Sequence, residues 1–395
     1  MQYNKWIEVD LEAIKNNVIQ VKSLLNEQDV RLIAVLKNGA YGHGAAEYAR
    51  ELYKYGVDFF AVSYLEEALA LREAGLKGKV MLMTPLMREE DYKAALQNNI
   101  TLTIASCEDW NRVRYVSARM RTAAAVHLKI ETGLSRFGLN LDDASQITAN
   151  YNNEEDFIYI EGIYTHMAQA DNKAFTLKQY HLFQEIARSI EATGIKIKLK
   201  HCANSAVFLD YPELRLDAVR IGTLLYGQYP AGASSRPLTL EEPFKYKCRI
   251  MAVKARNKGS YLGYQSTYRL KADAQVAVIP VGYSDGLGVE IANPPAGFID
   301  MLKIVAKTVL KYLQVSQTSL TVKIGGQNYP VRGKVFMQMA LVEIPAQKNV
   351  KAGDEVEVPI RKTLAGAQIT RLYTIKGVAG KKKDNSGTTY LTEGE

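Results

Sequence analysis

A lysine that directly follows an apolar run has the most distinctive chemistry in this sequence. Lys37 comes after RLIAVL (31–36) and before NGAYGHG. The glycines of the second segment let the backbone approach a ligand closely. A lysine amine can form a Schiff base with a carbonyl group when burial or neighbouring cations lower its pKa. Taken alone, such a residue is more often a solvated surface lysine, so other residues must support the chemical interpretation.

Other polar residues also follow or end β-branched and apolar runs. Arg136 lies in KIETGLSRFG, His166 follows YIEGIYT, and Arg220 lies in LDAVRI. Each alone has an ordinary explanation, either a hydrogen-bonded histidine or an ion-paired arginine. The turn VRIGT offers backbone N–H groups and a hydroxyl, which suit a phosphate, although it lacks the pattern of a P-loop. The remaining candidates are Tyr41, His201, Asn204, Ser205, Gly222 and Thr223.

The histidines and cysteines have no metal-ligand spacing. His43, His201 and Cys202 form no pattern typical of a zinc site. The three cysteines, Cys107, Cys202 and Cys248, are an odd and scattered set without a CxxC pair. This argues against a disulfide framework and fits a reducing cytosol. We therefore expect no catalytic metal.

Eight short apolar runs, alternating with helical patterns, must position these residues. Stretches with 3.6-residue periodicity, such as GAAEYARELYKYG and LEEALALREAG, lie between the runs. Regular alternation indicates a parallel sheet, because parallel neighbours need crossover connections. The eight runs are residues 31–36, 58–62, 79–83, 100–104, 124–130, 159–165, 196–201 and 216–221.

Eight such units favour a closed (β/α)8 barrel of the TIM type, with an open doubly wound sheet as the alternative. In such a barrel the catalytic groups lie at the carboxyl ends of the strands, and phosphate often binds after strands seven and eight. Lys37, Arg136, His166 and Arg220 all fall at or just after predicted strand ends. We therefore expect them to converge on one rim of an α/β barrel.

The sequence changes character after about residue 230. The turn-rich segment PAGASSRPLTLEEP ends the alternation. Short strand-like runs follow it: KYKCRIMAVKA, QVAVIPVG, SLTVKI, YPVRGKVF, ALVEIP and DEVEVPI. We expect the barrel over residues 1–235 and a mostly β domain over residues 236–395. Within the second domain, GFIDMLKIVAKTVLKYLQ (297–314) has helical spacing and is predicted as an inserted helix.

Charge and hydropathy restrict the partners. The 395-residue chain has a net charge of +8, but its lysines and arginines are interleaved with acids. A solvated basic surface explains this better than a nucleic-acid site. No apolar stretch is long enough to span a membrane, and no signal peptide is visible at the N-terminus. We expect a cytoplasmic protein with neither nucleic acid nor a membrane among its partners.

At AVLKNGAYGHG the chain resembles the alanine racemase family of fold-type III pyridoxal-phosphate enzymes. Further similar stretches follow in family order: HLKIETGLSRFG, EGIYTHMAQAD, HCANSA, VRIGTLLYG, LGYQSTYR, IPVGYSDG and RGKVFM. Several ordered motifs are more specific than one lysine box. The resemblance implies an N-terminal (β/α)8 barrel with a C-terminal β domain, in agreement with the independent interpretation above.

The resemblance also implies a site for pyridoxal 5′-phosphate. Lys37 would carry the cofactor as a Schiff base, Arg220 would face its pyridine nitrogen, and His166 would lie beside it. The phosphate would be held by Tyr41, Ser205, Gly222 and Thr223, with Asn204 beside them.

Substrate-binding residues follow from the same resemblance. Arg136 would bind the substrate carboxylate, and Lys129 matches a lysine that many family members carry in carbamylated form to orient this arginine. Tyr264, in LGYQSTYR, matches the catalytic tyrosine, and Met337 matches a substrate-binding backbone position. In the family these last two residues reach the active site of the other subunit. The resemblance therefore implies a head-to-tail homodimer.

Racemisation explains why two bases are needed. One base removes the α-proton and the other returns a proton on the opposite face, so Lys37 and Tyr264 would act as the pair. Tyrosine has an ordinary pKa of about 10, so it needs cationic or hydrogen-bonding neighbours to act near neutrality. His166 and Arg220 would supply them. The implied reaction interconverts L- and D-alanine.

Four departures from the family pattern concern specificity more than the core chemistry. Gly39 stands where the family usually has asparagine, and Gly263 and Gln265 replace the usual serine and glycine beside the tyrosine. Met-Gln-Met at 337–339 replaces Met-Asp-Gln, which removes an acid, and the segment 293–318 is longer than usual. In addition, a tyrosine of the C-terminal family motif aligns loosely with Thr370. The smaller side chain would leave room for serine or a larger amino acid.

Other functions remain open from sequence. A serine or broad-specificity amino-acid racemase would use the same machinery. A non-catalytic pyridoxal-phosphate-binding protein would share the barrel, but such proteins are short single barrels. A decarboxylase of this fold would place an acid at the pyridine nitrogen, which Arg220 opposes. The sequence also leaves open whether D-alanine enters peptidoglycan precursors or the enzyme acts in catabolism.

Overall fold

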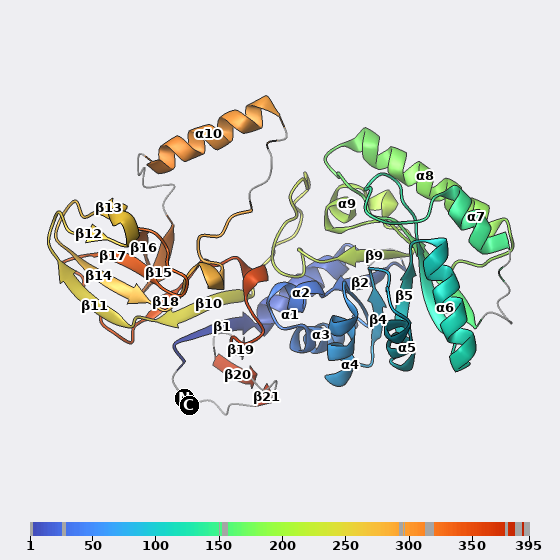
Figure 1. The fold of residues 1–395 in the computed structure, drawn as a ribbon, viewed down its shortest axis with the longest axis horizontal. Coiled ribbons are helices and arrows are strands. Elements are labelled where there is room, and N and C mark those ends of the chain that lie inside the picture. The colour runs from blue at the N-terminus through green and yellow to red at the C-terminus, as the bar shows by residue number, and fades with distance from the viewer. Residues whose placement is uncertain are drawn as a thin grey trace. The chain divides into compact units, whose positions relative to one another are not determined.

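The chain forms two compact units in a computed structural model. The structure describes residues 3–25, 29–149, 151, 157–291, 295, 297–312, 320–375, 378–383 and 389–390. The first unit is residues 11–243, and the second is residues 1–10 together with 244–395. Figure 1 shows helices around the strands of the first unit and mostly strands in the second.

The first unit is a barrel of eight parallel strands. They are hydrogen-bonded in the order β8-β7-β6-β5-β4-β3-β2-β9, and every pair is parallel. Because β9 pairs with β2, the last strand returns to the first and the barrel is nearly closed. This confirms the TIM-type prediction. The strands are β2 (Arg31–Val35), β3 (Phe59–Val62), β4 (Lys79–Leu82), β5 (Ile100–Ile104), β6 (Ala124–Lys129), β7 (Ile158–Tyr164), β8 (Leu199–His201) and β9 (Ala218–Ile221).

Helices connect these strands, and α3 shows why the segments are helical. Its residues Tyr48, Ala49 and Leu52 are fully buried and fall on one helix face. Gly56 then ends the turn with φ of 74°, a conformation that glycine adopts without steric strain. The helices are α1 (Leu11–Ser23), α3 (Ala45–Lys54), α4 (Leu65–Glu73), α5 (Glu89–Gln97), α6 (Cys107–Met120), α7 (Leu141–Ala149), α8 (Lys173–Glu191) and α9 (Ser205–Asp210), with a short 3-10 turn at Pro212–Leu214. The segment labelled α2 (Lys37–Tyr41) is a left-handed turn.

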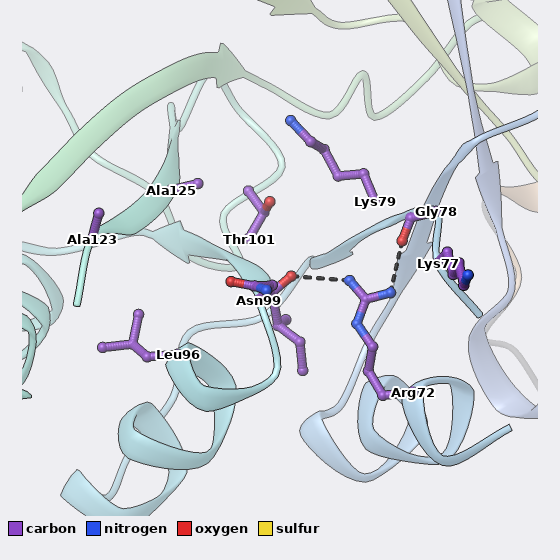
Figure 2. Close-up of a pocket in the computed structure, with 10 residues that line it drawn as sticks. Arg72, Lys77, Gly78, Lys79, Leu96, Asn99, Thr101, Ala123 and Ala125 are labelled. Carbon is purple, nitrogen blue, oxygen red and sulfur yellow. Dashed lines mark hydrogen bonds between the residues drawn. The ribbon is translucent and has the colours of Figure 1, made fainter. Parts of the chain in front are cut away.

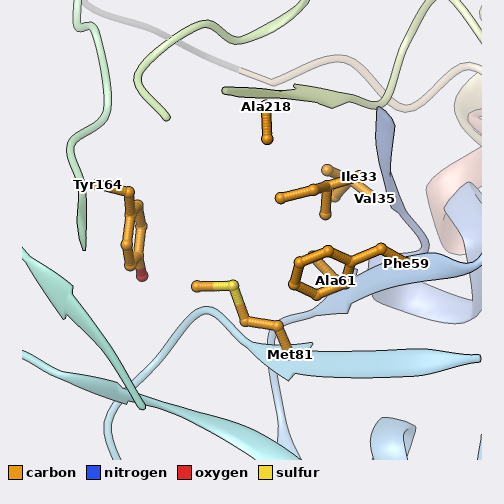
Figure 3. Close-up of a cluster of buried hydrophobic side chains, with 7 residues drawn as sticks. All are labelled: Ile33, Val35, Phe59, Ala61, Met81, Tyr164 and Ala218. Atoms are coloured by element: carbon orange, nitrogen blue, oxygen red, sulfur yellow. The ribbon is translucent and has the colours of Figure 1, made fainter. Parts of the chain in front are cut away.

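Side chains from alternate strand positions fill the barrel interior. Successive residues of a strand point to opposite faces, so every second residue faces the barrel axis. Figure 3 shows the resulting cluster of Ile33, Val35, Phe59, Ala61, Met81, Tyr164 and Ala218. The interior is therefore a packed core, which holds the strand ends at fixed positions.

The second unit is built on one eleven-stranded sheet. Its order is β11-β14-β17-β16-β15-β18-β10-β1-β19-β20-β21, and only β1 and β19 pair in parallel. Each of the six strand-like runs contains a strand. The strands are β1 (Lys5–Asp10), β10 (Phe244–Arg249), β11 (Ala252–Arg256), β14 (Ala274–Ile279), β15 (Thr321–Ile324), β16 (Gln327–Arg332), β17 (Ala340–Pro345), β18 (Glu355–Glu357), β19 (Arg371–Ile375), β20 (Val378–Lys383) and β21 (Thr389–Tyr390).

The first strand of the chain belongs to this second sheet. Strand β1 pairs antiparallel with β10 and parallel with β19, and its Ile7 and Val9 are fully buried. The domain boundary predicted at residue 235 assigns this segment to the barrel instead. The short length of β1 and the distance in sequence to its partners explain why pattern alone did not locate it.

The remaining elements of the second unit are short, apart from one helix. The ribbon of β12 (Tyr261–Leu262) and β13 (Tyr268–Arg269) flanks a 3-10 turn at Tyr264–Ser266, and two more 3-10 turns lie at Tyr283–Asp285 and Lys362–Leu364. Helix α10 (Phe298–Tyr312) occupies the inserted segment, as its spacing predicted. No helix in the described part of the chain is long and apolar enough to cross a membrane.

Candidate active site

The barrel brings the predicted residues of its rim together. Lys37 follows β2, His166 follows β7, Ser205 opens α9 after β8, and Arg220 lies within β9. These residues share one electrostatic environment. Burial and then the nearby cations, beginning with Arg220 and Arg136, lower the pKa of His166 to about 3. His166 is therefore neutral at physiological pH.

Lys37 is held by an unusual stretch of backbone. Five consecutive residues after it have positive φ, from 53° at Asn38 through 61° at Gly39 to 90° at Gly42. Non-glycine residues are strained in this region, by about 1–2 kcal/mol each. The backbone N–H of Asn38 donates to the Glu67 carboxylate, which anchors the turn. Asparagine and glycine both tolerate left-handed backbone, so Gly39 keeps the conformation available to the usual family residue.

The Lys37 amine is set up to be nucleophilic. Burial and then the charge of Arg136 lower its pKa, although Glu67 opposes the shift. A lower pKa leaves more of the amine in the neutral form that attacks carbonyl groups. Its Nζ lies 5.9 Å from the centroid of the Tyr41 ring. The lysine and the tyrosine therefore face the same small region.

A cradle of four residues contains one polar atom that has no hydrogen-bond partner among the described residues. The four residues are Tyr41, Ser205, Gly222 and Thr223. The backbone N–H of Gly222 donates to Ser205 Oγ at 3.2 Å, and a Cβ at Gly222 would lie 2.8 Å from the Tyr41 hydroxyl. The Thr223 hydroxyl is buried and has no hydrogen-bond partner among the described residues. Burial raises the pKa of Tyr41 to about 12, so its hydroxyl remains a donor. A phosphate would satisfy these groups.

Asn204 shapes the cradle without entering it. Its side-chain oxygen caps α9 by accepting from the backbone N–H groups of Ala206 and Val207, both at 3.1 Å. Its amide nitrogen donates to the Met167 carbonyl at 3.1 Å. Both ends of the side chain are therefore engaged, so Asn204 fixes the position of Ser205.

Arg220 is a buried cation with most of its donors satisfied. One terminal nitrogen donates to His201 Nδ1 at 2.7 Å and to the His201 carbonyl at 3.0 Å, and the other donates to the Thr165 carbonyl at 2.6 Å. The guanidinium lies 5.1 Å from the ring centroid of Tyr164. Burial lowers its pKa, but arginine stays charged in proteins.

Arg220 is the first member of a row of polar side chains that runs through the barrel. His201 Nε2 lies 2.8 Å from His127 Nδ1, and His127 Nε2 lies 3.3 Å from Glu161 Oε2. Glu161 pairs with Lys79, the first residue of β4. We call these five residues the barrel polar row. It connects the rim with the opposite ends of the strands.

The protonation states of the barrel polar row follow from burial and from the contacts within the row. Burial lowers the pKa of His201 and of His127, although Glu161 opposes the shift at His127. Both imidazoles are therefore neutral at physiological pH. Burial alone would raise the pKa of Glu161, but hydrogen bonds from His127 and Lys79 outweigh it and lower the value to about 2. The row thus has a cation at each end, with neutral histidines and one carboxylate between them.

Sequence patterns did not assign His127, Glu161 and Lys79 to the site. A signal was present, because His127 lies inside AAVHLKI and Glu161 inside YIEGIYT, and most other residues of these strands are apolar. Buried polar groups need partners. Two such residues on adjacent strands, β6 and β7, are candidates for partners of each other.

A cavity of about 350 Å³ lies at the end of the barrel where the row terminates (Figure 2). Lys79, Ile100, Ala123 and Ala125 at the starts of β4, β5 and β6 help to line it. Arg72 also lines it, but its guanidinium donates to four backbone carbonyls, those of Leu76, Gly78, Asn98 and Asn99. The arginine is therefore structural, and we assign the cavity no chemistry of its own.

Lys129 is an almost completely buried lysine beside two arginines. It is 1% exposed, and its Nζ lies 4.9 Å from the ring centroid of Phe137. Burial, then Arg220 and Arg136, lower its pKa to about 8. Burial and the two arginines outweigh the opposing charge of Glu131. The Lys129 amine therefore loses its proton more readily than the amine of a surface lysine.

Arg136 lies on a loop organised by one carboxylate. Glu131 accepts backbone N–H groups from Gly133 at 2.5 Å, Ser135 at 3.0 Å and Arg136 at 3.4 Å. The Arg136 guanidinium lies 4.9 Å from the ring centroid of Phe137. The side chain is exposed. An exposed arginine on an ordered loop is suited to binding a carboxylate.

Tyr264 and Met337 lie together in the second unit. The rings of Tyr264 and Phe336 meet edge to face with centroids 5.1 Å apart, and Phe336 precedes Met337 in the chain. The Met337 carbonyl accepts from the backbone N–H of Ser284 at 3.0 Å and from its hydroxyl at 2.7 Å. The side chains of Tyr264 and Met337 are 69% and 59% exposed. Large exposed side chains of this kind are available to contact another molecule.

The substitutions beside Tyr264 carry backbone strain. Gln265 and Ser266 have φ of 59° and 50°, a region that a glycine would enter without strain. The amide oxygen of Gln265 accepts from Lys334. Thr370, the other departure, is buried beside β19, and its carbonyl accepts from the N–H of Ile7 at 2.9 Å.

The barrel rim fits a phosphorylated aldehyde cofactor. Lys37 offers a nucleophilic amine, the cradle offers an unsatisfied hydroxyl at Thr223, and Arg220 offers a fixed cation. None of the described residues form a cluster of three or more potential metal ligands. This arrangement can hold a phosphate, bind a carbonyl group covalently and stabilise an anion.

Comparison with known proteins agrees over almost the whole chain. The N-terminal domain of alanine racemase matches residues 9–230, and the C-terminal domain of alanine racemase matches residues 244–379. The alanine racemase of Methanococcus maripaludis is 33% identical over 89% of this chain and 88% of its own length. The structure of alanine racemase from Clostridium difficile 630 has a TM-score of 0.85 at 28% identity and covers 98% of this chain and 99% of that one.

A solved structure with a bound ligand is also similar. The alanine racemase of Bacillus anthracis with bound L-Ala-P has a TM-score of 0.82 at 26% identity, covering 97% of this chain and 98% of that chain. The barrel, the β domain and the rim define an enzyme of the amino-acid racemase class. The chain belongs to the alanine racemase family.

Proposed function

We propose that this enzyme interconverts L- and D-alanine with pyridoxal 5′-phosphate held on Lys37. The observation that carries the proposal is the rim of the barrel, where a lysine of lowered pKa faces a cradle whose Thr223 hydroxyl is buried without a partner. Tyr41, Ser205 and Gly222 would hold the phosphate with Thr223. Membership of the alanine racemase family supports the same cofactor and the same substrate.

The other rim residues would hold the ring and the substrate. When bound, pyridoxal 5′-phosphate withdraws electrons from the substrate and so acidifies its α-proton. The charged Arg220, fixed by His201 and Thr165, would keep a proton off the pyridine nitrogen. His166 would lie against the ring in its neutral form. Arg136 would bind the substrate carboxylate.

Two proton carriers on opposite faces would complete the reaction. The Lys37 amine would take or give the α-proton on one face, and the Tyr264 phenol would do so on the other. We propose that Tyr264 and Met337 come from the partner subunit of a homodimer. Their large exposed fractions in a single chain support this assignment. A carbamylated Lys129 would carry a negative charge and orient Arg136, which the lowered pKa of its amine supports.

The test is racemisation by the purified holoenzyme. The protein is incubated with L-alanine and with L-serine in parallel, and both D-enantiomers are followed by chiral chromatography. We expect D-alanine to appear much faster than D-serine. Serine racemised at an equal or greater rate would replace this assignment with a serine or broad-specificity racemase. Neither product, from protein that retains the cofactor, would contradict both assignments.

The cofactor assignment has its own test. The Lys37→Ala variant should lose the visible absorbance of the cofactor-loaded enzyme, because the covalent link to the lysine is absent. A non-catalytic pyridoxal-phosphate-binding protein would show the same absorbance as an enzyme but no racemisation. The match of both family domains favours the enzyme. We propose a cytoplasmic enzyme whose D-alanine enters peptidoglycan precursors.

A further inference from the structure

Helix α10 is the feature of this chain that racemase chemistry does not explain. It occupies the segment that is longer than the family pattern, between the 3-10 turn at Tyr283–Asp285 and β15. Every residue from Met301 to Leu310 is exposed. Figure 1 shows α10 as one continuous helix. An isolated helix of this length is marginally stable in water, so it needs a surface against which to pack.

The side chains of α10 are segregated by polarity. At 3.6 residues per turn, Phe298, Leu302, Val305 and Val309 fall on one face of the helix. All four are large apolar residues at least 49% exposed. Lys303, four residues before Lys307, falls on the other side of the helix with it. The helix is therefore amphipathic, and its apolar face is uncovered in the single chain.

The charge of α10 indicates which surface would cover it. Between residues 298 and 312 the sequence has three lysines and one acid, Asp300. Lys307 lies 3.5 Å from Glu290, outside the helix, and both side chains are well exposed. Basic amphipathic helices bind at the boundary between headgroups and acyl chains, where anionic lipids attract the lysines. A second copy of α10 would cover the apolar face, but it would add three more lysines and only one more acid.

We propose that α10 binds the surface of an anionic lipid membrane, with Phe298, Leu302, Val305 and Val309 entering the headgroup boundary. The helix would lie in the plane of the membrane and would not cross it, consistent with the finding that no described helix can span a bilayer. The sequence predicted no membrane partner because it contains no apolar stretch long enough for a span, but a helix that lies at a membrane surface needs no such stretch. The proposal is independent of the racemase assignment, since α10 contributes no residue to the rim.

Vesicle flotation of the full-length holoenzyme tests the proposal. Vesicles of phosphatidylcholine alone are compared with vesicles that also contain phosphatidylglycerol. We expect binding only to the anionic vesicles, with a decrease as salt rises, because the attraction to surface charge is screened. Absence of binding to anionic vesicles at low salt would overturn the proposal. Equal binding to neutral vesicles would overturn the role assigned to the lysines.

Paired variants separate the apolar and the charged contributions. Leu302→Glu/Val305→Glu should abolish flotation. Lys303→Glu/Lys307→Glu should weaken it by roughly fivefold or more for each lysine. The matched control is Lys254→Glu/Lys258→Glu, which makes the same charge change at two exposed lysines with the same spacing in the same unit. It should retain binding within about twofold. Unchanged far-UV circular dichroism and unchanged thermal unfolding in all three variants would show that they are folded.

Sedimentation velocity tests the alternative that a second copy of the chain covers the apolar face of α10. Wild-type protein without vesicles could form a larger assembly that the Leu302→Glu/Val305→Glu variant does not form. In that case α10 packs against α10 of a second chain, and the membrane proposal is wrong. The same assembly state for wild type and variant, together with flotation of the wild type only, supports the membrane proposal. A failure of racemisation would contradict the proposed function and leave this result unaffected.

Discussion

At the scale of single residues, the rim keeps several cations close together in a partly buried region. Arg136 and Arg220 both lower the pKa of Lys129, and Arg136 lowers that of Lys37. Mutual repulsion and burial act in the same direction on an amine, because both disfavour its charged form. The result is a pair of lysines that deprotonate more easily than surface lysines. One of them can attack an aldehyde, and the other can take up carbon dioxide.

Thr223 gives the sharpest test of the phosphate cradle. Its hydroxyl is buried and unpartnered, so replacing it in Thr223→Val should leave the stability of the cofactor-free protein unchanged or slightly higher. With the cofactor, the same change removes a hydrogen bond to a charged phosphate. We expect affinity for pyridoxal 5′-phosphate to fall about 10- to 100-fold. Cofactor titration by absorbance and urea unfolding measure the two effects.

Thr176→Val is the matched control for that prediction. The Thr176 hydroxyl is fully buried but donates to the Gln169 carbonyl at 2.8 Å. Its replacement should cost about 1 kcal/mol of stability and leave cofactor affinity unchanged. If Thr223→Val destabilised the cofactor-free protein as much as Thr176→Val and bound the cofactor normally, the cradle would be wrongly assigned.

At the scale of elements, the barrel polar row depends on five strands around the barrel presenting polar residues at matching depths. Residues of β9, β8, β6, β7 and β4 contribute to it, and each strand supplies one side chain. Glu161 has the largest thermodynamic consequence, because His127 and Lys79 hold its pKa at about 2. An unfolded glutamate has a pKa near 4.3. The carboxylate therefore stabilises the fold only where it is ionised.

The sign of the resulting pH dependence follows from the depressed pKa. Glu161 contributes its stability fully above the unfolded pKa and loses it as the pH falls through about 4 towards 2. The difference is on the order of 2–3 kcal/mol. We expect urea unfolding of wild type to show falling stability from about pH 5 downwards, and a shallower fall in Glu161→Gln. Glu161→Gln should also be less stable at pH 7, since Lys79 loses its partner.

An exposed acid on α4 provides the control for this comparison. Glu66→Gln removes a carboxylate that lies outside the barrel polar row, so its stability should follow the wild-type curve. Parallel curves for wild type and Glu161→Gln between pH 5 and pH 2 would contradict the inferred ionisation of Glu161.

The elements themselves could largely be predicted from the sequence, whereas their polar contacts could not. Runs such as RLIAVL and ITLTI are apolar because barrel strands are covered on both faces, so they stand out from amphipathic helices. The left-handed turn after Lys37 is invisible to such patterns, because Asn38 and Tyr41 adopt it only under the constraint of Glu67 and the surrounding fold. The row from Arg220 to Lys79 likewise depends on strand register, which one sequence does not specify.

At the scale of the whole molecule, the two units divide the proposed chemistry. The barrel carries Lys37, Arg136 and Arg220, and the β unit carries Tyr264 and Met337. The β unit also includes β1. The chain therefore starts in the β unit, forms the barrel over residues 11–243 and then completes the β unit. Sequence patterns predicted both folds but not this return, because pairing between segments hundreds of residues apart leaves no local signal. The proposed dimer would join a barrel to the β unit of its partner.

Hybrid dimers test whether the partner's Tyr264 serves each Lys37. Lys37→Ala and Tyr264→Phe are each expected to be inactive as homodimers. In a hybrid of the two, one site would combine an intact Lys37 with an intact Tyr264 from the other chain. Statistical assembly should then restore about a quarter of wild-type activity, since half of the dimers are hybrids with one intact site each. The control pairs Lys37→Ala with Arg220→Ala; both lesions lie in the barrel, so every hybrid site is damaged and no activity should return. Restoration in the control as well, or in neither mixture, would place Tyr264 outside the partner's site.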